Sequence, residues 1–207
     1  MRKIILSFMV LLIVAACSAP PKEESSFEIT GKEKEKIIGQ YTDRFLEPIN
    51  RDNITGFHEM LGGKFENFST SRYNFEAYSG GLLLVYDEED NLIFKEVMDH
   101  GNFLVELDLW EDYTVEISGF RDLYVMQVGT NPSQELFSGI WQVGLDIEAG
   151  NYTMTGEGHG YVQIFDANNQ TQVFEVIGND YVNTRSDVVL KEGQKIRING
   201  LSKVDFE

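Results

Sequence analysis

The chain has 207 residues, and its 34 acidic against 17 basic side chains give a formal net charge of −17 at pH 7. This balance argues against a nucleic-acid-binding protein, because phosphate contacts need a basic footprint and the only basic segment is the weak Lys195-Ile196-Arg197 run. The single cysteine excludes an intrachain disulfide, so a hydrophobic core must hold the fold, and a chain of this length can build one.

The first residues have the layout of an export signal. Arg2 and Lys3 form a short cationic segment, and residues 4–16 are an apolar stretch that closes on small alanines. Because a membrane-spanning helix needs about 20 apolar residues, this stretch is too short to span a bilayer. We therefore expect a cleavable signal peptide over residues 1–16, directly followed by the only cysteine, Cys17.

The run Val14-Ala15-Ala16-Cys17 resembles the lipobox of bacterial lipoproteins. The resemblance implies that Cys17 carries a diacylglyceryl thioether and becomes the first residue of the mature chain. Two acyl chains anchor a protein stably in a membrane, whereas one chain is marginal. The implied location is extracytoplasmic, with a Gram-positive cell surface favoured over a periplasmic setting because the chain has no disulfide. An unmodified exported thiol is the alternative.

A tether and a helical segment are expected next. Residues 17–29 are rich in Pro, Ser and Glu, a composition typical of a flexible tether. In the segment 30–61, Thr30 and Glu33 have the spacing of a capping box, and apolar residues follow at helical intervals. A second short helix is expected over residues 55–61.

From residue 62 the pattern changes to short strands separated by Gly, Asn and Asp. Tyr73, Phe75 and Ala77 alternate with polar residues, as in a half-buried strand. Residues 82–86 and 92–97 flank the acidic turn 87–91 and predict a hairpin. Further strands are expected over residues 103–109, 115–117 and 123–128. Together they predict a β-sandwich module over residues 62–129.

The same pattern recurs later in the chain. A shift of 79 positions places Tyr73 on Tyr152 and Glu96 on Glu175, and after a two-residue insertion a shift of 81 places Gly119 on Gly200. This order of matches predicts a tandem duplication, with a linker at residues 130–134 and a second module over residues 137–207. The expected fold is mainly β, with two tandem duplicated β-sandwich modules preceded by a short α-helical segment.

The second module opens with the segment Gly139–Tyr152, which contains Val143-Gly144, Asp146-Ile147 and Ala149-Gly150. This segment resembles the "VG-x-DI-x-AG-x-Y" modules of secreted and lipid-anchored proteins of low-GC Gram-positive bacteria. The resemblance implies a small β-sandwich and supplies no catalytic role.

Motifs for catalysis or metal binding are missing. The sequence has no G-x-S-x-G elbow, P-loop or nucleotide-binding glycine fingerprint, and Gly156–Gly160 is expected to form a tight hairpin between two strands. The turn Asp87–Asp90 lacks the EF-hand pattern and is expected to be a solvated acidic turn, and His58, His100 and His159 lack metal-ligand spacing. We therefore expect no catalytic residue, no metal and no cofactor.

Aromatic side chains are the remaining candidates for a binding site. Tyr78 and Trp110 are out of phase with the apolar faces of their strands, which predicts exposure and makes them the candidate ligand contacts. Trp141 is in phase with its apolar neighbours and is expected in the core.

The leading hypothesis is a lipid-anchored, non-catalytic surface protein that binds a protein or a glycan at the cell envelope. One alternative is an envelope hydrolase with paired carboxylates, and another is a purely structural spacer. The oligomeric state is left open.

Overall fold

The computed structural model describes residues 39, 44–48, 57–60, 62–178 and 185–207. Within them the chain is mainly β without a helix, and it forms one sheet of ten strands and one of four. The signal segment, Cys17 and most of the expected helical segment lie outside the described residues. Residues 44–48 are irregular, and residues 57–60 form a strand, so the helix expected over residues 55–61 is wrong there.

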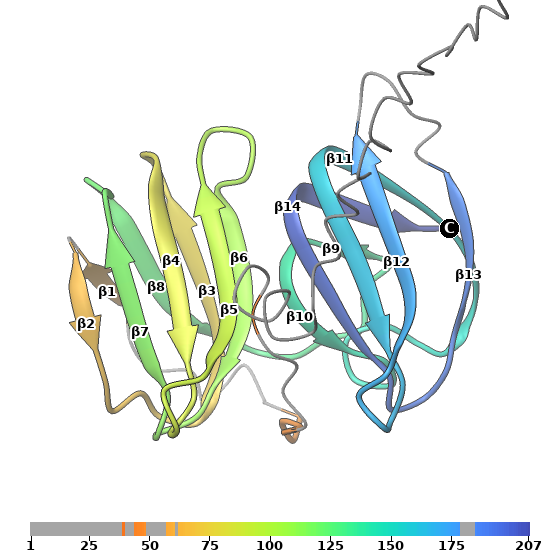
Figure 1. The fold of residues 1–207 in the computed structure, drawn as a ribbon, viewed down its shortest axis with the longest axis horizontal. Helices are drawn as coiled ribbons and strands as arrows, with labels where there is room; N and C mark the ends of the chain where they lie inside the picture. The colour runs from red at the N-terminus through yellow and green to blue at the C-terminus, as the bar shows by residue number, and fades with distance from the viewer. Residues whose placement is uncertain (1–38, 40–43, 49–56, 61, 179–184) are drawn as a thin grey trace, which may run out of the picture.

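The strands fall into two groups along the chain, which we call the first half and the second half (Figure 1). The first half contains β1 (Phe57–Met60), β2 (Gly63–Phe65), β3 (Ser71–Ala77), β4 (Gly81–Tyr86), β5 (Leu92–Met98), β6 (Leu104–Leu109), β7 (Thr114–Ser118) and β8 (Leu123–Val128). The second half contains β9 (Glu135–Leu136), β10 (Ser138–Gln142), β11 (Gly150–Phe165), β12 (Thr171–Gly178), β13 (Ser186–Leu190) and β14 (Lys195–Phe206). The expected strands of residues 62–129 are confirmed.

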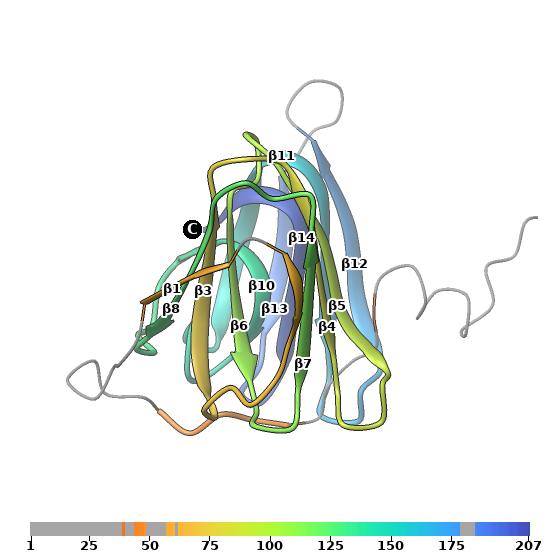
Figure 2. The same ribbon diagram turned by 90° about the vertical axis from the view of Figure 1, so that its left-hand side faces the viewer.

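In the first half two layers pack face to face. One layer has the order β1-β8-β3-β6 and the other β2-β7-β4-β5, and Figure 2 shows β3 and β8 on one side with β4 and β5 on the other. Alternation along the strands turns Phe75 and Val105 of one layer toward Leu83 and Val115 of the other, and all four are fully buried. The first hydrophobic core lies between these layers.

The second half makes two layers from fewer, longer strands. β11 pairs with β13 through its first residues and with β12 through its last, and β14 runs beside it from Met154 to Phe165. The register shifts on either side of Gly158, which has a φ of +105°, and a side chain on Gly160 would clash with the carbonyl oxygen of Asn199. Gly156–Gly160 is thus a bulged bend within one strand, and the expected tight hairpin is wrong.

The strand registers of the two halves correspond. Tyr73 stands opposite Leu107 in the first half, and Tyr152 stands opposite Val188 in the second. The same offsets, 79 positions for residues of β3 to β5 and 81 for residues of β6 to β8, relate further pairs of opposite residues. The first-half pair Phe75–Val125 corresponds to Met154–Phe206 in the second half, Gly81–Met98 corresponds to Gly160–Ile177, and Leu83–Ile117 corresponds to Val162–Ile198. An offset of 76 relates Gly63 opposite Ile117 to Gly139 opposite Ile198.

The two halves share one continuous sheet. β6 and β10 pair in parallel, with Val105 opposite Ser138 and Glu106 opposite Gly139, and this contact joins the halves into the ten-stranded sheet. Gly139 has a φ of +152°, and any side chain on it would clash with the carbonyl oxygen of Glu106. Glycine is therefore required at the point where the halves meet.

Candidate functional site

The outer face of β3 and β8 carries an open hollow of about 580 Å³. Its lining, which we call the Tyr78 surface, consists of Glu76, Tyr78, Asp122, Tyr124 and Met126. Glu76 and Tyr124 stand opposite each other in the antiparallel pair, and strand alternation turns them away from the core. Two neighbouring strands and their ends thus bring two aromatic rings and two carboxylates to one surface.

Tyr78 is held in place at this surface although it is 60 % exposed. Its ring packs edge to face against Tyr124 with centroids 5.7 Å apart, and its backbone N–H donates to the carbonyl oxygen of Asp122 at 3.1 Å. Its hydroxyl donates to the carboxylate of Glu76, which raises the pKa of Tyr78. The surface therefore offers a fixed, neutral aromatic ring beside hydrogen-bond acceptors.

The expected exposure holds for Tyr78 but not for Trp110. Trp110 is half-buried against the first core, its ring is tilted on Tyr113 at 5.1 Å, and the guanidinium of Arg44 lies 5.8 Å from its centroid. It lies away from the Tyr78 surface, among residues that pack the first core. Trp141 is a core residue as expected, and its indole N–H donates to the carbonyl oxygen of Phe137 at 2.8 Å.

A buried cluster of charges joins the two halves. Arg72 of β3 donates from Nε to Asp108 of β6 at 2.7 Å, and its two terminal nitrogens donate to the carboxylate of Asp146 in the second half. Asp146 also accepts the backbone N–H of Gln142 at 2.8 Å, and the guanidinium lies over the ring of Trp141 at 5.1 Å. We call Arg72, Asp108 and Asp146 the junction ion cluster.

The guanidinium of Arg72 remains charged despite its burial, whereas burial raises the pKa of Asp146 and Arg72 opposes that rise. Only 1 % of the side chains of Arg72 and Asp146 is exposed, and 8 % of that of Asp108. Burial lowers the pKa of Arg72, but the two carboxylates outweigh this effect and leave the pKa above its ordinary value. Two carboxylates do converge here, as the hydrolase hypothesis requires, but both are occupied by Arg72 and hidden from solvent.

A second line of contacts joins β5 to β14. The buried carboxylate of Glu96 accepts hydrogen bonds from the side chain of Asn199 at 3.0 Å and from the backbone N–H of Gly200 at 2.9 Å. Burial raises the pKa of Glu96, and these hydrogen bonds oppose the rise. Arg197, also buried, donates to the carbonyl oxygens of Ile93 at 3.0 Å and Gly39 at 2.9 Å. These polar side chains are thus bonded to partners across the junction.

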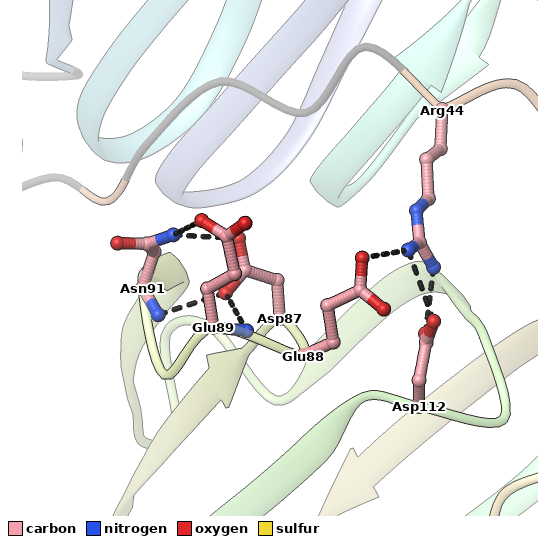
Figure 3. Close-up of polar contacts among 6 residues, drawn as sticks. All are labelled: Arg44, Asp87, Glu88, Glu89, Asn91 and Asp112. Carbon is pink, nitrogen blue, oxygen red and sulfur yellow. Dashed lines mark hydrogen bonds and ion pairs between the residues drawn. The ribbon is translucent and has the colours of Figure 1, made fainter.

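The acidic turn between β4 and β5 contacts the segment that precedes β1. Arg44 forms ion pairs with Asp112 at 2.6 Å and with Glu88 at 3.1 Å (Figure 3). Asp87 instead caps its own turn by accepting the backbone N–H groups of Glu89 and Asn91.

Among the described residues, no three potential metal ligands form a group that could hold an ion. His100 and His159 are exposed on different strands or turns, and the side chain of His58 lies outside the described part.

Comparison with known proteins returned no match to a family model, to a curated protein or to a solved structure. In the part of the chain that the structure describes, no helix has the length and apolar character needed to cross a membrane.

The pairing of Arg72 with Asp146 is not visible in the sequence. Arg72 alternates with the core residues of β3 and so falls on the face that local pattern assigns to solvent. Its burial depends on the second half, and Asp146 lies 74 positions away. The one local signal is that Asp146 belongs to the opening segment of the second module.

Proposed function

We propose that this protein is a non-catalytic, glycan-binding lipoprotein that is anchored at the outer face of a bacterial membrane through Cys17. The observation that carries the binding proposal is the Tyr78 surface, where an exposed ring is fixed beside two carboxylates. The anchor is supported by the resemblance of Val14–Cys17 to a lipobox.

The chemistry of the Tyr78 surface suits a sugar. The apolar face of a sugar ring packs on an aromatic ring, and its hydroxyl groups donate to carboxylates such as those of Glu76 and Asp122. Tyr78 is already fixed by Tyr124 and Glu76, so little side-chain entropy is lost when a ligand binds. The acidic groups favour a glycan that carries hydroxyl or amino groups over one that carries phosphate or carboxylate.

We also propose that the two halves are duplicated β-sandwich modules. The matching registers support this, since common offsets relate paired residues in the strand pairs of the two halves. Local details agree: the hydroxyl of Tyr73 donates to the carbonyl oxygen of Ser69 and that of Tyr152 to Glu148, both at 3.0 Å. Asp87 and Asp166 cap their turns with the same pair of hydrogen bonds.

A glycan array probed with the mature chain tests the binding proposal. We expect binding to envelope-type glycans that Tyr78→Ala reduces at least about tenfold, which corresponds to about 1.4 kcal/mol. Phe174→Ala, which removes an exposed ring from β12, is the matched control and should leave binding unchanged. Absence of glycan binding, or equal binding by Tyr78→Ala, would overturn the proposal.

Membrane fractionation tests the anchor. Cys17→Ala should release the protein into the medium or leave it unprocessed, because no thioether can form. If the variant stays with the membrane as firmly as the wild type after processing, the lipoprotein proposal is wrong.

A further inference from the structure

Each of the two strands that join the halves, β6 and β10, has a counterpart in the other half, and these counterparts lie at the two ends of the molecule (Figure 1). β13 corresponds to β6 by the offset of 81, but among the described residues it pairs only with β11. β2 corresponds to β10 by the offset of 76, and in the same part of the chain it pairs only with β7. Within the described residues, one strand edge is therefore unpaired at each end: the edge of β13 that corresponds to the paired edge of β6, and the edge of β2 that corresponds to the paired edge of β10.

The open edge of β2 has the backbone that the junction requires. Gly139 adopts a φ of +152° so that Glu106 can approach it closely. Its counterpart Gly63 has a φ of +123°, yet the nearest atom to a side chain there would be 4.0 Å away on the ring of Phe65. Gly63 thus has the same kind of strained conformation as Gly139, but among the described residues no strand lies beside it.

The contacts that join β5 to β14 also have counterparts at the open ends. The contact of Glu96 with Gly200 corresponds by the same offsets to Glu175 on β12 and Gly119 after β7. Gly119 has a φ of +85°, close to the +74° of Gly200. The glutamate and the positive-φ glycine of this contact are therefore retained at the open ends, whereas Asn199 and Arg197 correspond to Ser118 and Glu116.

The residues of the junction ion cluster are not retained. The counterparts of Arg72, Asp108 and Asp146 are Asn151, Val189 and Asn67, the last by the offset of 79 that also relates Ser69 to Glu148. All three counterparts are exposed, and Val189 is a large apolar residue with 58 % exposure. The open ends can therefore meet without burying an unpaired member of the junction ion cluster.

We propose that a second copy of this chain binds head to tail, with β13 of one copy pairing in parallel with β2 of the next, as β6 pairs with β10 within a chain. Ser186 would stand opposite Gly62 and Asp187 opposite Gly63, and Glu175 would accept the backbone N–H of Gly119. The proposal rests on the proposed duplication. Because each added copy leaves the same two ends open, the assembly is an open row, and a membrane anchor would concentrate its members.

Sedimentation of the mature chain with Cys17→Ser tests the proposal without a lipid or a thiol. We expect dimers and longer species that grow with concentration, and a dissociation constant that Val189→Lys raises at least about tenfold, because a lysine charge would be buried. Val176→Lys is the matched control: Val176 is 66 % exposed on β12 at the open end, and its counterpart Val97 stays 62 % exposed on β5 beside the junction within the chain. Association that Val189→Lys leaves unchanged would overturn the proposal.

A designed pair gives a second test that does not depend on the natural affinity. Asn151→Arg with Val189→Asp in one chain, and Asn67→Asp in the other, would rebuild the junction ion cluster across two copies. The mixture should associate at least about tenfold more tightly than either variant alone. If neither the mixture nor the wild-type chain associates, the proposal fails. Glycan binding by these variants should be unchanged, so a failure here is separable from a failure at the Tyr78 surface.

Discussion

Arg72 shows how one residue can fix the relation between two parts of a chain. A guanidinium with 1 % of its side chain exposed is tolerated only when its donors are occupied, and here Asp108 and Asp146 occupy them from the two halves. The planar fork of arginine suits this geometry, because one edge contacts Asp146 with two nitrogens while Nε reaches Asp108.

Arg72→Met should therefore destabilise the protein strongly. It leaves two carboxylates without their counter-ion in a buried site, and loss of one partner of a buried ion pair costs about 3 to 5 kcal/mol. Chemical denaturation measures the change in the free energy of unfolding. Arg121→Met is the matched control, since Arg121 is exposed and its loss should change stability by less than about 0.5 kcal/mol. Equal effects of the two substitutions would show that the junction ion cluster does not hold the halves together.

Glu96 makes the stability of the junction depend on pH. Burial raises its pKa in the folded state above the ordinary value of 4.5, so the folded protein binds this proton more tightly than the unfolded chain. The contribution of Glu96 is then most favourable below pH 4.5 and is lost as the pH rises through the folded-state pKa. Relative to Glu96→Gln, the wild type should become more stable as the pH falls from about 7 toward 4.5. Denaturation of both proteins across this range measures the difference, and a constant difference would contradict the pKa shift.

At the scale of the elements, local pattern predicted the strands but not their partners. Alternation identified β3, β6 and β8, because a strand with one face on a core carries that information in its own residues. The glycines of the bend in β11 predict a hairpin because glycines favour turns, whereas the structure keeps the strand continuous through its pairing with β14. The sequence predicts a helix where the structure has β1, since four residues carry too little periodicity to distinguish a helix from a strand.

The parallel contact of β6 with β10 depends on Gly139. Gly139→Ala would place a methyl group against the carbonyl oxygen of Glu106, so the strands must separate, and we expect a loss of more than about 2 kcal/mol. Gly193→Ala is the matched control: its φ of +78° is also unfavourable for alanine, but its surroundings are open, so only about 1 to 2 kcal/mol of backbone strain is expected. Thermal unfolding compares the two variants, and a larger effect at Gly193 would contradict the role of Gly139.

At the scale of the whole molecule, the two halves form one continuous body with the Tyr78 surface on its outside. The exposure of Tyr78 was predictable from its phase relative to β3, but the ring of Tyr124 and the carboxylate of Asp122 reach the same surface only through the pairing of β3 with β8. The partial burial of Trp110 was not predictable, because Arg44, which lies over its ring, is distant in sequence. Sequence alone thus found one member of the candidate site and missed the arrangement around it.

Nuclear magnetic resonance mapping of a bound glycan on the isotope-labelled mature chain tests the central proposal most directly. The glycan is the tightest binder from the array, titrated to saturation. We predict that the largest shift changes fall on Glu76, Tyr78, Asp122, Tyr124 and Met126, and that the ring signals of Tyr78 move with the same dissociation constant as the backbone amides. Saturation that leaves these five residues unchanged and shifts another face of the molecule would contradict the assignment of the Tyr78 surface as the binding site.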